Sequence, residues 1–180
     1  AEGHQDYMAQ YVIDPDTLMI NEIMAAARSG LRDEDGDLSD WIELYNKGDQ
    51  MMSLANIAVS DDEQRPTKWI FPEDAYIAPG GYYLVFCSGK DRRPASGYPH
   101  TNFSIAAQGE TIVLSTIQGQ IIDRISFSTL PADCTYGRNH ATGEWEVFTV
   151  ATPGAPNNHE GAAMAERYLR SLNETGVYIT

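Results

Sequence analysis

The stretch Tyr82-Tyr83-Leu84-Val85-Phe86-Cys87 decides the fold class. Its side chains are apolar or aromatic at both odd and even positions, which is typical of a strand that is covered on both faces and lies centrally in a sheet. A second run, Trp41-Ile42-Glu43-Leu44-Tyr45, alternates aliphatic residues with a mixed set. That alternation predicts a strand with one face in the core. We expect these two strands to anchor the hydrophobic core.

Similar short apolar runs, bounded by Gly, Pro, Asn or Asp, continue on both sides of these two, with little helical periodicity. The eight predicted strands are Leu18–Met24, Trp41–Tyr45, Ile57–Ser60, Lys68–Phe71, Tyr82–Cys87, Thr111–Ser115, Ile121–Phe127 and Trp145–Thr149. Gln118-Gly119 provides a hairpin turn between two of them, because Gly adopts the positive φ that such turns need. This pattern predicts an all-β antiparallel sandwich or barrel.

The chain is expected to hold one domain, from residue 18 to residue 158. Residues 1–17 are polar and irregular and are interpreted as a leader or linker. Residues 159–180 are interpreted as a short helix, centred on Ala162–Leu172, followed by the start of a further strand or domain. The unfinished strand pattern of Gly176–Thr180 fits the first strand of another copy of the domain, and it also fits a chance likeness.

Charge and composition exclude several classes of function. The 180 residues include 26 acidic and 12 basic residues, for a formal net charge of −14, so the mean field repels nucleic acids and acidic lipid surfaces. No apolar run approaches the roughly 20 residues that span a bilayer, so direct membrane insertion is not expected. Cys87 and Cys134 share no disulfide or metal-binding spacing and are expected to be unpaired.

The densest acidic cluster is Asp33-Glu34-Asp35-Gly36-Asp37-Leu38-Ser39-Asp40, between two predicted strands. Calcium prefers six to eight hard oxygen ligands, and Asp33, Asp35, Asp37 and Asp40 are the candidates to supply several of them. The spacing departs from the EF-hand loop, because Gly36 stands fourth and no Glu follows at the twelfth position. A tight Asp-Gly-Asp turn with solvated acids is the alternative interpretation.

Sequence motifs for catalysis are weak. The four histidines are scattered over loops and tails, and no Ser occupies a Gly-x-Ser-x-Gly turn. A glycosidase or phosphoesterase that uses clustered carboxylates is the remaining enzymatic alternative. The three tryptophans lie in strand runs and are expected in the core. Tyr98, His100 and Phe103, in the loop from Gly89 to Phe103, are the candidates for a ligand-binding surface.

Several of these segments, taken in order, resemble the lamin tail domain in its bacterial form. They are Leu18–Met24, Asp35–Asn46, Trp69-Ile70-Phe71-Pro72, Pro79-Gly80-Gly81-Tyr82, Thr135-Tyr136-Gly137-Arg138 and Thr152–Asn157, which together cover roughly residues 18 to 158. The resemblance implies an immunoglobulin-like β-sandwich. It also implies a module of a larger secreted or cell-surface bacterial protein, beside neighbouring domains that carry the catalysis.

We therefore expect a non-catalytic, extracellular or cell-surface module that attaches to a protein or polysaccharide or spaces its neighbouring domains. No cofactor is expected apart from the calcium considered above. Two alternatives stay open: a hydrolase that uses the acidic loop, and self-association in which Gly176–Thr180 adds to a sheet edge of a neighbouring copy.

Overall fold

The computed structural model describes residues 16–174, and within the C-terminal helix it describes side chains only as far as Ala165 and that of Arg167. The elements of the described chain are β1 (Leu18–Met24), β2 (Asp40–Asn46), β3 (Met52–Ser53), β4 (Ile57–Ser60), β5 (Trp69–Ile70), β6 (Tyr76–Ile77), β7 (Tyr82–Cys87), β8 (Thr111–Thr116), β9 (Ile121–Ser126), β10 (Thr135–Arg138), β11 (Trp145–Phe148) and α2 (His159–Glu174). Gly176–Thr180, expected to begin a further strand, lies outside the described residues. No helix in the described range is long and apolar enough to cross a membrane.

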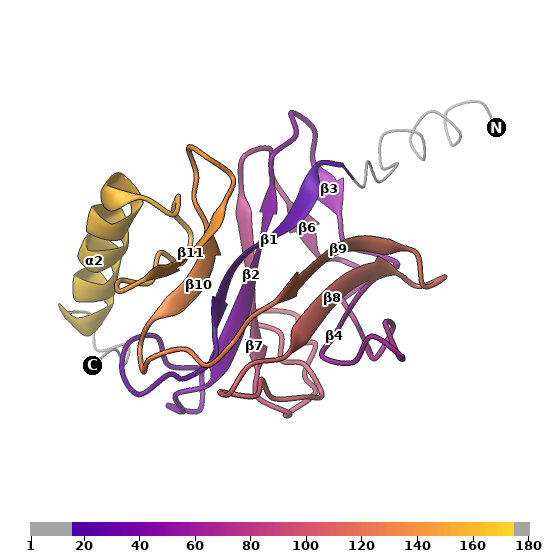
Figure 1. The fold of residues 1–180 in the computed structure, drawn as a ribbon, viewed down its shortest axis with the longest axis horizontal. Helices are drawn as coiled ribbons and strands as arrows, with labels where there is room; N and C mark the ends of the chain where they lie inside the picture. Colours follow the sequence, from indigo (N-terminus) through magenta and orange to yellow (C-terminus); the bar gives the residue numbers. More distant parts are fainter. Residues whose placement is uncertain (1–15, 175–180) are drawn as a thin grey trace.

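The strands form two main antiparallel sheets. One has the order β11-β10-β1-β2-β7, the other has the order β5-β4-β8-β9, and β3 pairs with β6 in a small ribbon. Figure 1 shows the five-stranded sheet between α2 on one side and β8 and β9 on the other. The predicted all-β sandwich is confirmed, with one helix added to its outer side.

The core lies between the two sheets. The five-stranded sheet contributes Ile20, Ile42, Leu44 and Val85, and the four-stranded sheet contributes Ile57, Val59, Trp69, Ile112 and Leu114. Each of these side chains is at most 2% exposed. Burying one large aliphatic side chain contributes roughly 1.5–3 kcal/mol, so this set supplies the main driving force for folding.

Strand β7 is buried on both faces from Leu84 to Cys87, as its sequence predicts, but its expected central position is wrong. It is the last strand of its sheet, and its free edge is covered by the loop that follows it. Phe86 donates its N–H to Pro99 O at 3.0 Å and accepts the N–H of Thr101 at 2.8 Å. An apolar strand can therefore lie at a sheet edge, because an extended loop takes over the hydrogen bonds that a neighbouring strand would make.

A β-bulge at Asn21 redirects strand β1. Ile20 pairs with Leu44 and Glu22 pairs with Glu43, so one extra residue stands on β1 between these two pairs. Beyond a bulge the side chains change face. Glu22 consequently lies on the outer face of the sheet, directly opposite Glu43, instead of continuing the inward alternation of Leu18 and Ile20.

The outer face carries a second, smaller apolar cluster. Met24, Trp41, Leu84 and Phe86 form it together with Leu31. Helix α2 begins after Asn158, whose side-chain oxygen accepts the N–H of Gly161 at 2.8 Å, a typical N-cap contact. The helix therefore starts three residues before the predicted core segment Ala162–Leu172, and Ala165 is buried against the domain.

Candidate functional site

Asp33 organises the acidic loop. Its side chain is buried, and its Oδ1 accepts the backbone N–H groups of Asp35 at 3.0 Å and Asp37 at 2.9 Å. Its Oδ2 accepts the hydroxyl of Ser39 at 3.2 Å. The turn at Gly36, with φ of 82°, closes the loop around this carboxylate. The sequence Asp-Glu-Asp-Gly-Asp therefore folds as an Asx-type turn centred on one buried acid.

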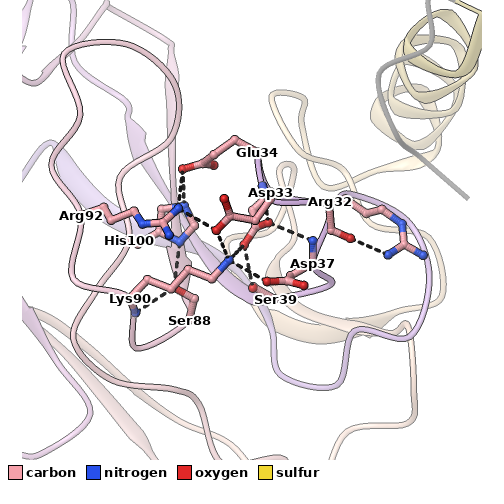
Figure 2. Close-up of polar contacts among 11 residues, drawn as sticks. Arg32, Asp33, Glu34, Asp37, Ser39, Ser88, Lys90, Arg92 and His100 are labelled. Atoms are coloured by element: carbon pink, nitrogen blue, oxygen red, sulfur yellow. Dashed lines mark hydrogen bonds and ion pairs between the residues drawn. The ribbon is translucent and has the colours of Figure 1, made fainter.

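Lys90 offsets part of the negative charge of this loop. Its ammonium lies 2.6 Å from Asp33 Oδ2 and 2.8 Å from an oxygen of both Asp35 and Asp37. Figure 2 shows the ammonium pointing between Asp33 and Asp37, from the neighbouring loop after β7. Burial alone would raise the pKa of Asp33, but the hydrogen bonds from Lys90 and from the loop backbone outweigh it and lower that pKa. The same carboxylates raise the pKa of Lys90.

The structure brings together three of the four candidate calcium ligands. One oxygen from each of Asp33, Asp35 and Asp37 lies within 4.8 Å of the others, which is close enough to share a cation. Asp40 is not part of this group, because its Oδ1 accepts the N–H of Ala27 at 3.3 Å at the start of β2. A metal ion would have to displace the Lys90 ammonium. The geometry favours the tight-turn interpretation, with Asp33 buried and paired with Lys90 instead of solvated, and calcium binding stays a prediction.

The loop from Gly89 to Phe103 was expected to expose Tyr98, His100 and Phe103 for ligand binding, but two of these side chains are buried. Phe103 is 5% exposed and belongs to the main core, while His100 is fully buried and stacks on Phe86 with ring centroids 5.3 Å apart. Burial of these two side chains anchors the loop on the domain, so neither is presented to solvent. Tyr98 alone is half-buried, with its ring edge against Phe86, and it borders a pocket on the outer face.

His100 joins two loops through a hydrogen-bonded chain that the sequence did not reveal. Its Nδ1 lies 2.7 Å from Ser88 Oγ and its Nε2 lies 2.9 Å from Glu34 Oε1 (Figure 2). Ser, His and Glu in this order resemble a hydrolytic triad. In a triad, however, the imidazole must pass a proton to the leaving group of the substrate. The complete burial of His100 prevents that contact, so the chain of bonds holds the acidic loop against the Gly89–Phe103 loop.

The outer face contains a buried pair of carboxyl groups, Glu22 and Glu43. Glu22 accepts the hydroxyl of Thr135 at 2.7 Å and the N–H of Thr152 at 3.0 Å. Glu43 accepts the N–H of Gly154 at 2.6 Å and the side-chain amide of Asn21 at 3.3 Å. Both residues are at most 1% exposed. The pair therefore fastens the segment from Thr152 to Gly154, which leads into α2, onto the sheet.

Burial raises the pKa of both groups. The pKa of Glu22 rises from 4.5 to about 7 because burial outweighs its hydrogen bonds. Burial, followed by repulsion from Glu22, raises the pKa of Glu43 well above its ordinary value. The pair therefore holds protons around neutral pH, since two adjacent carboxylates cannot both ionise cheaply without water.

The hydroxyl of Thr152 links Glu22 to the segment that follows. It donates to Glu22 Oε1 at 3.1 Å and also faces Asn157 Oδ1. Asn157 donates both of its amide hydrogens, to Asn21 O at 2.8 Å and to Arg138 O at 2.9 Å. Glu22 is therefore connected through Thr152 to the amide that joins β1 and β10.

Comparison with known proteins identifies the chain. A model of the lamin tail domain family matches residues 13–129, which is well over half of the sequence. The chain belongs to the lamin tail domain family. No curated protein matches it. The expected membership and the immunoglobulin-like sandwich are both confirmed, and the domain is an immunoglobulin-like module.

This lamin tail domain continues its sheet beyond the matched residues. Strands β10 and β11 extend the five-stranded sheet from the free side of β1, through the pairs Glu22 with Gly137 and Tyr136 with Val147. Thr152 and Asn157 then close over the outer face. The family match begins before β1 and ends before β10, so it does not test the expected domain boundaries at residues 18 and 158, which stay a prediction.

Proposed function

We propose that this lamin tail domain is a non-catalytic module of a larger secreted or cell-surface bacterial protein, and that it attaches that protein to another protein or to a polysaccharide. A module that only spaces its neighbouring domains would have the same fold but no ligand. The family membership supports a module, because it gives an immunoglobulin-like domain over most of the described chain. The attachment partner and the cellular location are the proposed part.

The observation that carries the proposal is that the acids of the loop Asp33–Asp37 form ion pairs within the domain. Asp33, Asp35 and Asp37 are tied to Lys90, and Arg92 lies 2.7 Å from Asp35. Carboxylates that act as general acid and base must face a substrate and titrate separately. Carboxylates that share one ammonium instead hold two loops together. The strongest sequence candidate for hydrolysis therefore has a structural explanation.

Two of the three tryptophans are buried, which also argues against a catalytic cleft, while Trp145 is half-buried. Trp41 and Trp69 are 2% and 1% exposed, so neither can stack on a sugar in a catalytic cleft. Strand β11, in contrast, is the last strand of its sheet and carries an exposed Val147. An extended peptide can add to such an edge through main-chain hydrogen bonds. We therefore place the proposed protein-binding site at the free edge of β11.

A binding screen tests the proposal. The chain is immobilised and exposed to a defined panel of bacterial surface polysaccharides and extracellular proteins, and binding is measured by biolayer interferometry. We expect saturable binding to at least one member. Val147→Pro, which disrupts an edge strand, should weaken binding to a protein ligand, while Ile121→Pro at the edge of the other sheet serves as the matched control. Failure to bind any member would leave only the spacer role and contradict attachment.

A hydrolase is the second candidate, favoured by the Ser88–His100–Glu34 chain of hydrogen bonds. The same polysaccharides and model phosphoesters are assayed for product release. Release by the unaltered chain that disappears in Ser88→Ala would support the hydrolase and overturn the non-catalytic proposal. Release that persists in Ser88→Ala but is lost in Asp35→Ala would support hydrolysis by the acidic loop. Release that is unchanged in both variants would point to a contaminating enzyme, in which case the non-catalytic proposal stands.

A further inference from the structure

The free edge of β11 presents main-chain groups that can pair with a further strand. Asn139 donates its N–H to Glu144 O at 2.7 Å where β10 turns into β11. Main-chain groups point alternately to the two sides of an antiparallel strand, so those of Glu146 point to β10 and those of Trp145 and Val147 point away from it. β11 is the last strand of its sheet, and within the described residues no hydrogen bond joins the outward groups to another segment. The edge can therefore accept a strand from outside.

The side chains of β11 form two rows of different chemistry. Trp145 packs against the main core, and Val147, on the same face, is 50% exposed. Glu144 and Glu146 lie on the other face and are exposed. Neither forms an ion pair with a basic residue of the described chain, and Glu146 accepts the side-chain amide of Asn139 at 3.2 Å. The edge therefore has an apolar row on one face and an acidic row on the other.

A pocket beside Val147 continues the apolar row. Its volume is about 320 Å³, and it lies between Val147, Tyr136 of β10 and the segment of residues 126–130. Phe127 and Leu130 form its apolar wall and are buried. Pockets of roughly 300 Å³ hold small ligands, so this one has room for a leucine side chain. A side chain that an added strand places opposite Val147 lies on the same face, next to the pocket.

The charge of the domain favours a basic partner over a second copy of the chain. The formal net charge is −14, so two copies repel each other. Pairing β11 with β11 of a second copy also brings two acidic rows together, and like charges on neighbouring strands destabilise a sheet. A strand with Lys or Arg on that face instead forms opposite-charge pairs with Glu144 and Glu146. A polysaccharide lacks the alternating N–H and C=O groups that pair with a sheet edge.

We propose that the free edge of β11 binds an extended basic segment of another protein, added antiparallel to β11. Its Lys or Arg side chains pair with Glu144 and Glu146, and the apolar side chains between them lie against Trp145 and Val147, with one of them in the pocket. Every neighbouring pair in this sheet is antiparallel, which favours this direction. The inference rests on the attachment proposed above and narrows its partner to an alternating basic and apolar sequence.

Labelled peptides of equal length test the pattern by fluorescence anisotropy. One alternates Lys and Leu, the second has the same residues in two blocks, and the third alternates Glu and Leu. We expect the alternating Lys-Leu peptide to bind the unaltered chain at least about tenfold more tightly than either of the others. The block peptide has the same charge, so equal binding of the two basic peptides would show unspecific attraction to an acidic domain and overturn the proposal.

Backbone methylation of the peptide tests the strand pairing without any change to the protein. In an antiparallel pair the Leu opposite Val147 turns its N–H toward β11, whereas the flanking Lys residues turn theirs away. Methylation of the Leu nitrogen should therefore abolish binding of the alternating peptide, and methylation of a Lys nitrogen should leave it nearly unchanged. An equal loss with both modifications would overturn the proposal.

Variants assign the preference to the acidic row. Glu144→Lys combined with Glu146→Lys should reverse it in favour of the Glu-Leu peptide. Glu73→Lys combined with Asp74→Lys, at exposed positions before β6, changes the net charge equally and should leave it unchanged. An undiminished Lys-Leu preference in the folded β11 variant would overturn the proposal.

Two further results separate this inference from the attachment itself. Saturable binding in the screen above, without any preference among the three peptides, would overturn the inference and leave attachment standing. Dimerisation of the unaltered chain in light scattering that Val147→Pro abolishes would place a second copy on the edge of β11, and it would also overturn the inference.

Discussion

Glu22 of β1 lies directly opposite Glu43 of β2, with both carboxyl groups buried on the outer face of the same sheet. Two acids at such a position would repel each other if both were ionised. The segment Thr152–Gly154 donates to both groups: the N–H and hydroxyl of Thr152 to Glu22, and the N–H of Gly154 to Glu43. The relationship couples the ionisation of the pair to the attachment of that segment.

The domain is predicted to lose stability as the pH rises through neutrality. The pKa of Glu22 is about 7 in the folded chain against an ordinary value of 4.5, so the folded state binds the proton more tightly than the unfolded state. The stabilisation is complete below pH 4.5 and is lost as the pH rises through about 7. At roughly 1.4 kcal/mol per pKa unit, the loss amounts to about 3 kcal/mol.

Urea unfolding across this pH range measures the effect, with Glu22→Gln as the comparison. The neutral amide cannot ionise, so the variant should show a much weaker decrease in the free energy of unfolding. Asp33 titrates in a different window, because its pKa is lowered and its contribution is lost only in acid. Parallel curves for the two proteins between pH 4.5 and 7 would show that Glu22 is not protonated in the fold.

Asp33→Ala is predicted to destabilise the domain by roughly 2–3 kcal/mol, since several hydrogen bonds to a buried charge are lost together. Asp37→Asn provides the matched control in the same loop, because its side chain is 62% exposed. That change should stay within about 0.5 kcal/mol. Chemical denaturation gives both values, and a similar cost for the two variants would contradict the central role of Asp33.

Lys90→Met is predicted to change the response of the domain to calcium. In the unaltered chain the ammonium occupies the space between Asp33, Asp35 and Asp37, so roughly millimolar calcium should not shift the melting temperature relative to a chelator. Without the ammonium the three carboxylates repel each other. The variant should melt lower and recover part of the loss with calcium. Stabilisation of the unaltered chain by calcium would favour the metal site instead.

Asn157→Ala is predicted to loosen the segment that leads into α2, at a cost of roughly 2–4 kcal/mol, because a buried amide linking β1, β10 and Thr152 is removed. Asn158→Ala, which removes only the helix N-cap, should cost about 1 kcal/mol. Thermal melting compares the two. Hydrogen exchange at Thr152 and Gly154 should accelerate in the first variant more than in the second, and equal exchange would contradict the linkage.

The sequence predicted the apolar strands well because their signal is local. The bounds of β1, β4 and β7 match the predicted runs, and the Gln118-Gly119 hairpin is confirmed, with Gly119 at φ of 86°. Strand β10 was missed, since Thr135–Arg138 has a Gly in place of an apolar side chain. That Gly is required by packing, because a Cβ at residue 137 would lie 2.9 Å from the amide of Asn157.

The buried acid pair could not be predicted from alternation. A strict period of two would turn Glu22 inward with Ile20, and only the bulge at Asn21 moves it outward. The partners of the acidic loop were equally hidden, because Lys90 and His100 lie more than 50 residues along the chain and meet the loop only in the folded sheet. The spacing of the aspartates predicted a calcium site, whereas in the folded chain the ammonium of Lys90 lies between them.

Attachment without cleavage is tested most directly by co-sedimentation with insoluble bacterial surface polysaccharide, measuring bound chain and released sugar in the same tubes. The module described here predicts saturable binding with no release above a protein-free control over a prolonged incubation, in the unaltered chain and in Ser88→Ala alike. Sugar released in proportion to the bound unaltered chain, and absent with Ser88→Ala, would contradict a non-catalytic lamin tail domain.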